Sequence, residues 1–366
     1  MTEKALSDQD EDEQNRQPLT TYTTAARATR PRPTCARYLA LGSVPLLWGT
    51  FTPSMKLLME SKRAPPVLLT NFASHLVGAV ALAVLWSLEA LPRRACLPTD
   101  HRHLSADDSA TGRRRAMRAS CELGTYLFCG QLTQLLGLTG TSATTNAILV
   151  QSSVVFVTLF ENSARSLMPR ERLQHLMPSL LALVGVALIT LAPGLLRDAH
   201  AASAASAVRP TETPAGVACS LLSAAFYAMH TVRLSAYGDV DATVQATGQV
   251  SVNAILDVVV VSIAASFSLG GNMRRWLVRA DSAALKRLCV GATWNGVMIV
   301  GGTTWAMSYA QRTFRASTAA LAYAMEPLFA SLLAALILGD SIEPVQLLGG
   351  VFVVGANVLA GMRSEE

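Results

Sequence analysis

Residues 317–340 read STAALAYAMEPLFASLLAALILGD and decide the fold of the chain. The stretch is apolar and long enough to cross a bilayer as a helix, which takes about 20 residues. Glu326 and Pro327 lie side by side near its middle. A carboxylate at the centre of a membrane helix costs roughly 2.5–3.5 kcal/mol on insertion scales. Proline has no N–H, so a carbonyl near Tyr323, one turn earlier, loses its partner. The pair therefore predicts a functional site, or a hinge that faces a cavity.

The composition of the whole chain indicates an integral membrane protein. Of 366 residues, 51% are hydrophobic and only 15% are charged, against about 25% charged in an ordinary soluble domain. We predict an all-α membrane protein of about ten transmembrane helices. The apolar blocks that carry this prediction are 38–58, 66–88, 120–139, 142–162, 174–195, 214–235, 246–269, 287–310, 314–338 and 343–362.

The polar stretches between the blocks divide the chain into two halves. Residues 1–37 start acidic and end basic, which is typical of a disordered cytoplasmic tail. Residues 196–213 contain an Ala/Ser run and lie between the fifth and sixth blocks. We expect a linker there, between a first five-helix repeat at 38–195 and a second at 214–362, with a short C-terminal tail at 363–366.

The basic residues of the loops predict the orientation. With both termini in the cytoplasm, the inside loops hold more Lys and Arg than the outside loops, as the positive-inside rule requires. The loop at 270–287 is the exception, because it is basic and yet falls outside. We expect a multi-pass protein of the plasma membrane or of an organelle, and these two locations remain open alternatives.

An internal repeat relates the two halves. Residues 141–153 align without gaps with residues 316–328, at an offset of 175. Each half holds five predicted helices, and because five is odd the halves cross the membrane in opposite senses. We therefore predict inverted repeats with a substrate site at their interface, near the midplane. Offsets of 175–178 pair Gln151 with Glu326, Lys56 with Arg233, Asn71 with Gln249 and His75 with Asn253.

These features resemble the drug/metabolite transporter superfamily in its EamA-domain form. The resemblance covers residues 38–362 and implies ten helices in two halves that transport a small solute. Where many members have a proline in the fourth span, this chain has Gln151 followed by Ser152. The matching motifs are Trp48-Gly49 with Lys56, Thr141-Ser142-Ala143, Glu326-Pro327 with Gly339-Asp340, and Gln346 with Gly349 and Gly355.

Polar and aromatic residues inside the apolar blocks are the candidate site. Glu326 is a candidate proton carrier, or a structural group that pairs with freed backbone. Gln249, Asn253 and Asp257 recur every four residues, so they share one helix face that lines either a cavity or a hydrogen-bonded seam. The predicted cavity residues are Trp48, Asn71, His75, Asn146, Gln151, Tyr227, Gln249, Asn253, Asp257, Tyr323 and Glu326, with Pro327 as a helix hinge and Lys56 and Arg233 as vestibule cations or snorkelling residues.

The sequence favours a secondary transporter of small metabolites by alternating access, with proton coupling as an option. An organic-phosphate or nucleotide-sugar antiporter of the same superfamily is one alternative, and a membrane scaffold that does not transport is another. No nucleophile–base arrangement and no ATP-binding signature occurs in the sequence, so we expect neither an enzyme nor a primary pump. We expect no metal, no cofactor and no nucleic acid. The expected partners are a small-molecule solute, the lipid bilayer and, as an open alternative, a second copy in a homodimer.

Overall fold

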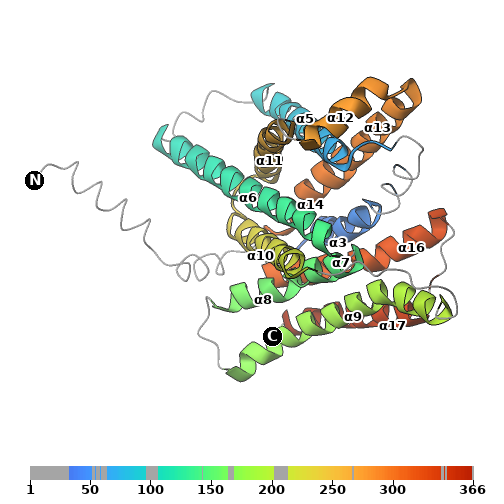
Figure 1. Cartoon of the computed structure of the whole chain (residues 1–366). Helices are drawn as coiled ribbons and strands as arrows, with labels where there is room; N and C mark the ends of the chain where they lie inside the picture. Colours follow the sequence, from blue (N-terminus) through green and yellow to red (C-terminus); the bar gives the residue numbers. More distant parts are fainter. Residues whose placement is uncertain are drawn as a thin grey trace, which may run out of the picture.

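The computed structural model consists of helices and their connections over the residues that it describes (Figure 1). It describes residues 33–51, 54, 58, 64–95, 106–141, 143–163, 169–201, 213–265, 268–338, 342 and 344–364. Most of the predicted N-terminal tail and linker, and Lys56, lie outside these residues. Within the described residues, five segments are long and apolar enough to cross a membrane: Leu69–Glu89, Leu173–Leu191, Pro214–Ala236, Ala242–Ile263 and Ala316–Ile337.

The helices of the first half follow the predicted apolar blocks, with two differences. α6 begins at Ala106, so about four polar and arginine-rich turns of helix precede the apolar block that starts at 120. The fourth block is not one helix, because Ser152 separates α7 from α8. The bounds are α3 Cys35–Gly49, α5 Val67–Ala95, α6 Ala106–Gly140, α7 Ala143–Gln151, α8 Ser153–Ser163 and α9 Pro169–Ala201.

The second half also contains interrupted helices. The eighth block holds a stretch of π-helix, η1, between α13 and α14, and the ninth is broken between α15 and α16. The region 270–287, expected as a loop, contains the amphipathic helix α12 and the start of α13. The bounds are α10 Pro214–Ala236, α11 Ala242–Ala265, α12 Ser268–Arg279, α13 Ser282–Trp294, η1 Asn295–Gly302, α14 Thr303–Ala310, α15 Ala316–Tyr323, α16 Glu326–Leu338 and α17 Pro344–Ser364.

Contacts between the halves define the directions of their helices. Three pairs of contacting helices are antiparallel: α5 with α11, α6 with α10, and α3 with α14. Two pairs are parallel: α6 with α11, and α5 with η1. Followed from one contact to the next, α3 and α10 run in opposite directions, and so do α5 and α11, and α6 and α14. The contacts that give these directions, in order, are His75–Asp257 and Glu89–Thr243, Glu122–Arg233 and Gly137–Ser220, Tyr38–Phe314 and Leu47–Gly302, Ser120–Gly248 and Gln131–Asn253, and Ser74–Gly296 and Leu82–Gly301.

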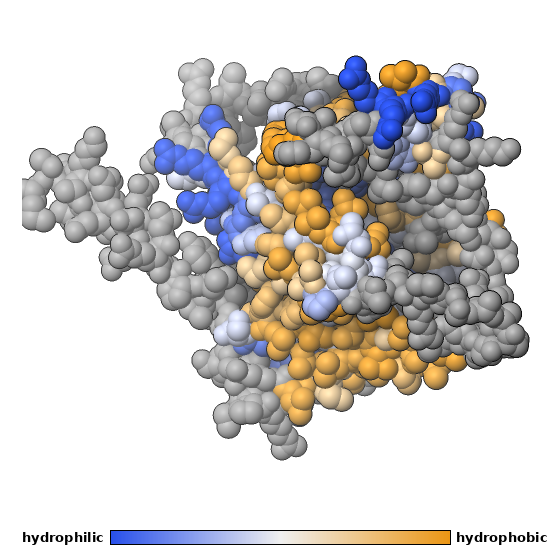
Figure 2. Space-filling view, in the orientation of Figure 1, coloured by the Kyte–Doolittle hydropathy of each residue, from blue (hydrophilic) through white to orange (hydrophobic). Residues whose placement is uncertain are grey.

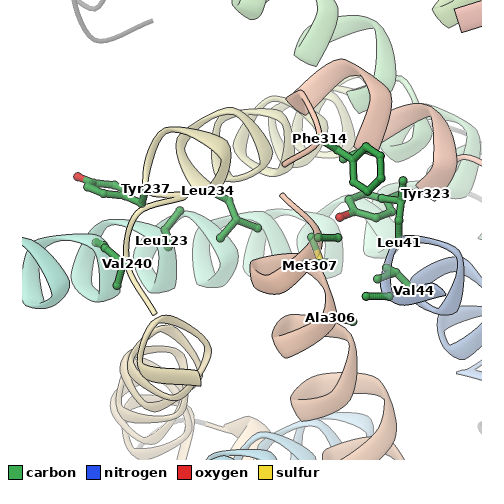
Figure 3. Packing of buried hydrophobic residues seen from close by; sticks show 14 residues of the cluster. Leu41, Val44, Leu123, Leu234, Tyr237, Val240, Ala306, Met307, Phe314 and Tyr323 are labelled. Atoms are coloured by element: carbon green, nitrogen blue, oxygen red, sulfur yellow. The ribbon is translucent and has the colours of Figure 1, made fainter. Parts of the chain in front are cut away.

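The largest apolar cluster joins the two halves at the end of the bundle where α3 begins, which we call the α3 end (Figure 3). Leu41 and Val44 come from α3 and Leu123 from α6, whereas Leu234 and Met307 come from α10 and α14. Because helices of both halves bury these side chains together, the cluster holds the halves closed at this end.

The outer surface is rich in exposed apolar side chains. Leu336 on α16 is 74% exposed and Val351 on α17 is 65% exposed. Figure 2 shows a broad apolar surface in the lower part of the molecule, where Figure 1 places α8, α9 and α17. Apolar patches of this extent are rare on soluble monomers, and here they are the surface that hydrocarbon would cover.

Candidate functional site

Two helix breaks, one in each half, form the centre of the candidate site. Pro327 cannot donate to the Tyr323 carbonyl, and the ninth block is interrupted at Ala324 and Met325, just before it. The first half breaks at Ser152 without a proline. The Ser152 hydroxyl donates to the Leu149 carbonyl at 2.5 Å, a local bond that competes with regular helix.

The two residues at these breaks contact each other. Gln151 is the last residue of α7 and Glu326 is the first residue of α16. Gln151 Nε2 donates to Glu326 Oε2 at 3.3 Å, in a pair whose members are 175 positions apart. The positions that the repeat alignment pairs are therefore neighbours in space, one neutral and one carboxylic.

Aromatic and amide groups lie next to this pair. The Tyr227 hydroxyl donates to Gln134 Oε1 at 2.8 Å. Asn146 Nδ2 donates to Ser220 Oγ at 2.8 Å and to the Gln134 carbonyl at 3.3 Å. These bonds join α6 and α7 of the first half to α10 of the second.

The other two predicted aromatic residues pack together. Trp48 and Tyr323 make an edge-to-face contact with ring centroids 5.4 Å apart, and Tyr323 Oη accepts a bond from Gln311 Nε2 at 3.1 Å. Gln134 and Gln311 are 177 positions apart, and each bonds a tyrosine hydroxyl. Both glutamines were missed as site residues, although the repeat offset that paired Lys56 with Arg233 also pairs them.

A second polar cluster joins α5, α6 and α11. His75 Nδ1 lies 2.7 Å from Asp257 Oδ2. Nε2 of the same histidine lies 3.1 Å from Gln131 Nε2, and Asn253 Nδ2 donates to Gln131 Oε1 at 3.0 Å. The structure thus brings three of the predicted residues together, with Gln131 as a fourth member that sequence reasoning did not single out.

The remaining predicted residues lie apart from these clusters. Gln249 is buried. Its Oε1 accepts a hydrogen bond from His230 Nε2 at 2.8 Å, and its Nε2 donates to Ser308 Oγ at 3.1 Å. Asn71, its partner in the repeat, is exposed on α5. Lys56 lies outside the described residues, so of the two predicted vestibule cations the structure describes Arg233.

Arg233, a predicted vestibule cation, is engaged at the α3 end. Its guanidinium donates through Nε and Nη2 to the Glu122 carboxylate, and the Nη2 bond is 2.9 Å long. The Tyr237 hydroxyl donates to Glu122 Oε2 at 2.6 Å. Burial and the Glu122 carboxylate raise the pKa of Tyr237 above its usual value. Arg115 adds a two-pronged pair with Asp239 nearby, so ion pairs join α6 to the end of α10.

Comparison with known proteins relates the second half of the chain to a family of membrane transporters. The model of the EamA-like transporter family matches residues 214–362, the second half of the chain. This match confirms the resemblance to the drug/metabolite transporter superfamily, to which that family belongs. The chain is therefore a multi-pass integral membrane protein with an EamA-like transporter domain.

Solved structures share the fold of the whole chain. Matches were found with 28 chains. One, described as "Crystal structure of protein", has a TM-score of 0.61 and 15% sequence identity, and the match covers 91% of this chain and 99% of that chain. At this identity the likeness concerns the fold alone. No curated protein matches the chain.

Proposed function

We propose that the chain is a secondary transporter of small metabolites or related solutes that works by alternating access. Its substrate site lies between residues 38–195 and residues 214–362. The contact between Gln151 and Glu326 carries this proposal, because it joins the two halves at two helix breaks. Broken helices that meet at a repeat interface are typical of substrate sites in secondary transporters.

The directions of the helices support an inverted repeat. α3 and α10, α5 and α11, and α6 and α14 occupy corresponding places in the two halves, and the members of each pair run in opposite directions. The same relation explains why α6 packs on α10 as α14 packs on α3. In this proposal a pseudo-two-fold axis passes near the Gln151–Glu326 contact and lies in the membrane plane.

The groups around Glu326 favour cationic, zwitterionic or neutral solutes. The described polar groups of the proposed site are the Glu326 carboxylate, amides and tyrosine hydroxyls. An organic-phosphate antiporter would need basic groups free to bind phosphate, usually arginine forks. Arg233 is already bound on both sides of its fork by Glu122. Transport of organic phosphates is therefore the weaker alternative.

Replacing Glu326 tests this function. A thermal-shift screen of the purified chain against metabolite pools first identifies a solute that binds. With a gradient of that solute across the membrane of proteoliposomes, we expect E326Q to lower the initial uptake rate about a hundredfold. A loss of this size is usual for a positioned acid–base group. Glu171→Gln, which changes an exposed carboxylate at the start of α9, is the matched control. Uptake by E326Q at the wild-type rate and with the wild-type pH dependence would show that Glu326 is structural. The scaffold alternative holds if the wild type transports no solute and if substitution of the predicted cavity residues leaves the binding of a partner protein unchanged.

A further inference from the structure

We propose that His75 and Asp257 form a proton-binding site of their own, distinct from the Gln151–Glu326 pair. The proposal of a proton-binding site rests only on the contacts between the described residues. Its role in driving solute movement rests on the proposed transport function.

The two side chains lie in different halves and are in direct contact. His75 belongs to α5 and Asp257 to α11, with 2.7 Å between Nδ1 and Oδ2. The His75 side chain is 2% exposed and the Asp257 side chain is 13% exposed. The imidazole is therefore sealed inside the protein, whereas the carboxylate keeps an edge through which a proton can arrive.

Hydrogen bonds determine which nitrogen of His75 carries its proton. Asn253 occupies Gln131 Oε1 by donating to it, so Gln131 presents its NH₂ group to His75 Nε2. A nitrogen that faces an amide donor has to accept. The neutral imidazole then carries its proton on Nδ1, the nitrogen that lies 2.7 Å from Asp257 Oδ2, although these two atoms do not have hydrogen-bond geometry. Donation runs from Asn253 to Gln131 and from Gln131 to His75.

The arrangement is poised to take up one proton. With a neutral imidazole the pair carries one negative charge, and an uncompensated carboxylate inside a membrane span is costly. An added proton has two destinations. It binds to the Asp257 carboxylate, or it binds to His75 Nε2 and forces Gln131 to turn its amide and release Asn253. Either outcome changes contacts among α5, α6 and α11, which is how a proton would act on the interface between the halves.

Other ionisable groups on the packed elements lie elsewhere. Within the described part of the chain, Asp257 is the one charged group that reaches ion-pair distance of His75. η1 has no ionisable side chain. Glu122 is nine residues from Gln131 on α6, about 13 Å along the helix. On α6, Tyr126 and Cys129 are the ionisable residues nearest Gln131 along the helix, and Arg113, Arg114, Arg115, Arg118 and Cys121 lie closer to its start. Those on the other packed elements are Glu89 at the far end of α5, His230 beside Gln249, Arg274, Arg275 and Arg279 on α12, Lys286, Arg287 and Cys289 on α13, and Tyr309 on α14.

α6 connects this site to a predicted cavity residue of the second half. Gln131 and Gln134 are separated by about one turn of helix. Gln131 contacts His75, and Gln134 bonds Tyr227 of α10. A shift of α6 on proton uptake would therefore reach the bond between Gln134 and Tyr227.

Proton counting on the purified full-length chain tests the site without any solute. Between mildly alkaline and mildly acidic pH, we expect D257N and H75Q each to take up about one proton fewer per molecule than the wild type. The matched control is D239N, an aspartate at the exposed ion pair with Arg115, measured over the same pH range. Monodisperse elution and an unchanged Tm confirm folding. Equal uptake by D257N and D239N would overturn the proposal.

Nitrogen-15 NMR of the histidine rings gives a second readout that does not depend on counting. The His75 signals, assigned by their loss in H75Q, should show a proton on Nδ1 and should change with pH in the wild type and not in D257N. A proton on Nε2 at alkaline pH would contradict the proposal. If the proton site is found and the wild type moves no solute, the transport function fails alone. If transport depends on Glu326 and D257N takes up the full number of protons, the proton site fails alone.

Discussion

At the scale of residues, the α3 end shows how a charge can be held near a membrane face. Arg233 was predicted to attract solute or to reach the headgroups, and in the structure its fork is bound by Glu122. Each of the two side chains is 22% exposed. A pair this buried leaves a costly unpaired charge when one member is removed.

A double-mutant cycle measures that cost. We expect E122Q and R233Q each to lower the free energy of unfolding by about 1–3 kcal/mol, since each leaves a charged partner without its bonds. The double variant should lose less than the sum of the two, because no orphaned charge remains. Unfolding midpoints in detergent give the measurement. D239N, at the more exposed pair, should change stability by less than about 1 kcal/mol. Strict additivity of the two single losses would mean that the pair does not stabilise the bundle.

At the scale of elements, α9 and α17 pack closely through glycines. They are antiparallel, since Gly185 faces Gly349 while Ile189 faces Gln346. A Cβ on Gly185 would meet the Gly349 carbonyl oxygen at 2.6 Å, and the reverse distance is the same. Close backbone contact of this kind is a common means of association between membrane helices.

Alanine substitutions distinguish glycines that pack from glycines that do not. We expect G185A to lower the free energy of unfolding by about 1–3 kcal/mol through overpacking. Gly355, also on α17, has no atom within 4 Å of the position of an added Cβ. G355A is therefore the control and should keep the wild-type midpoint. A loss as large in G355A as in G185A would refute the packing argument.

The sequence predicts the elements better than their interruptions. The apolar blocks locate the helices because hydrocarbon imposes a length and a composition on each span. They do not reveal the break at Ser152 or the π-helix at Asn295–Gly302, since both depend on local hydrogen bonds and tertiary contacts. α12 was missed because its polar face lowers the mean hydropathy of the segment, although Met273, Trp276 and Leu277 are spaced as on one face of a helix.

The candidate site was predicted unevenly, for a physical reason. The repeat alignment brought Gln151 and Glu326 together before any coordinates were known, because pseudo-symmetry carries spatial information. Glutamines such as Gln131 and Gln134 gave no signal of their own, since an amide in an apolar block is as compatible with a helix seam as with a site. The roles of all these residues remain predictions until they are tested.

At the scale of the whole molecule, the α3 end is closed. Tyr38 and Phe314 stack edge to face with centroids 4.9 Å apart, and Arg37 lies over the ring of Tyr309. Together with the apolar cluster and the ion pairs, these contacts join α3 and α6 to the second half. Alternating access requires this end to open.

Cross-linking tests whether that opening is part of the cycle. Cysteines at Tyr38 and Phe314, joined by a short bifunctional reagent with a cleavable bond, should stop uptake in proteoliposomes. Cleavage should restore it. The single variants Y38C and F314C, treated in the same way, control for modification alone. Undiminished uptake by the cross-linked protein would show that this end does not move during transport.

Cysteine labelling tests the orientation. With both termini in the cytoplasm, S105C should react from the inside and N272C, on α12, from the outside. The expectation follows from the loop arginines and from an odd number of spans in each half. Labelling of both positions from one face would contradict the inverted arrangement.

The two helix breaks differ in whether they can be undone. At Pro327 the missing N–H is a property of the ring, so that interruption is present in every conformation of the protein. At Ser152 the backbone N–H is intact and donates to the Ile148 and Leu149 carbonyls, and the hydroxyl donates to the Leu149 carbonyl as well. If the N–H and the hydroxyl both left the Leu149 carbonyl, α7 and α8 could continue as one helix. The chain would then have one permanent helix break and one reversible helix break, so its two halves need not undergo equivalent movements.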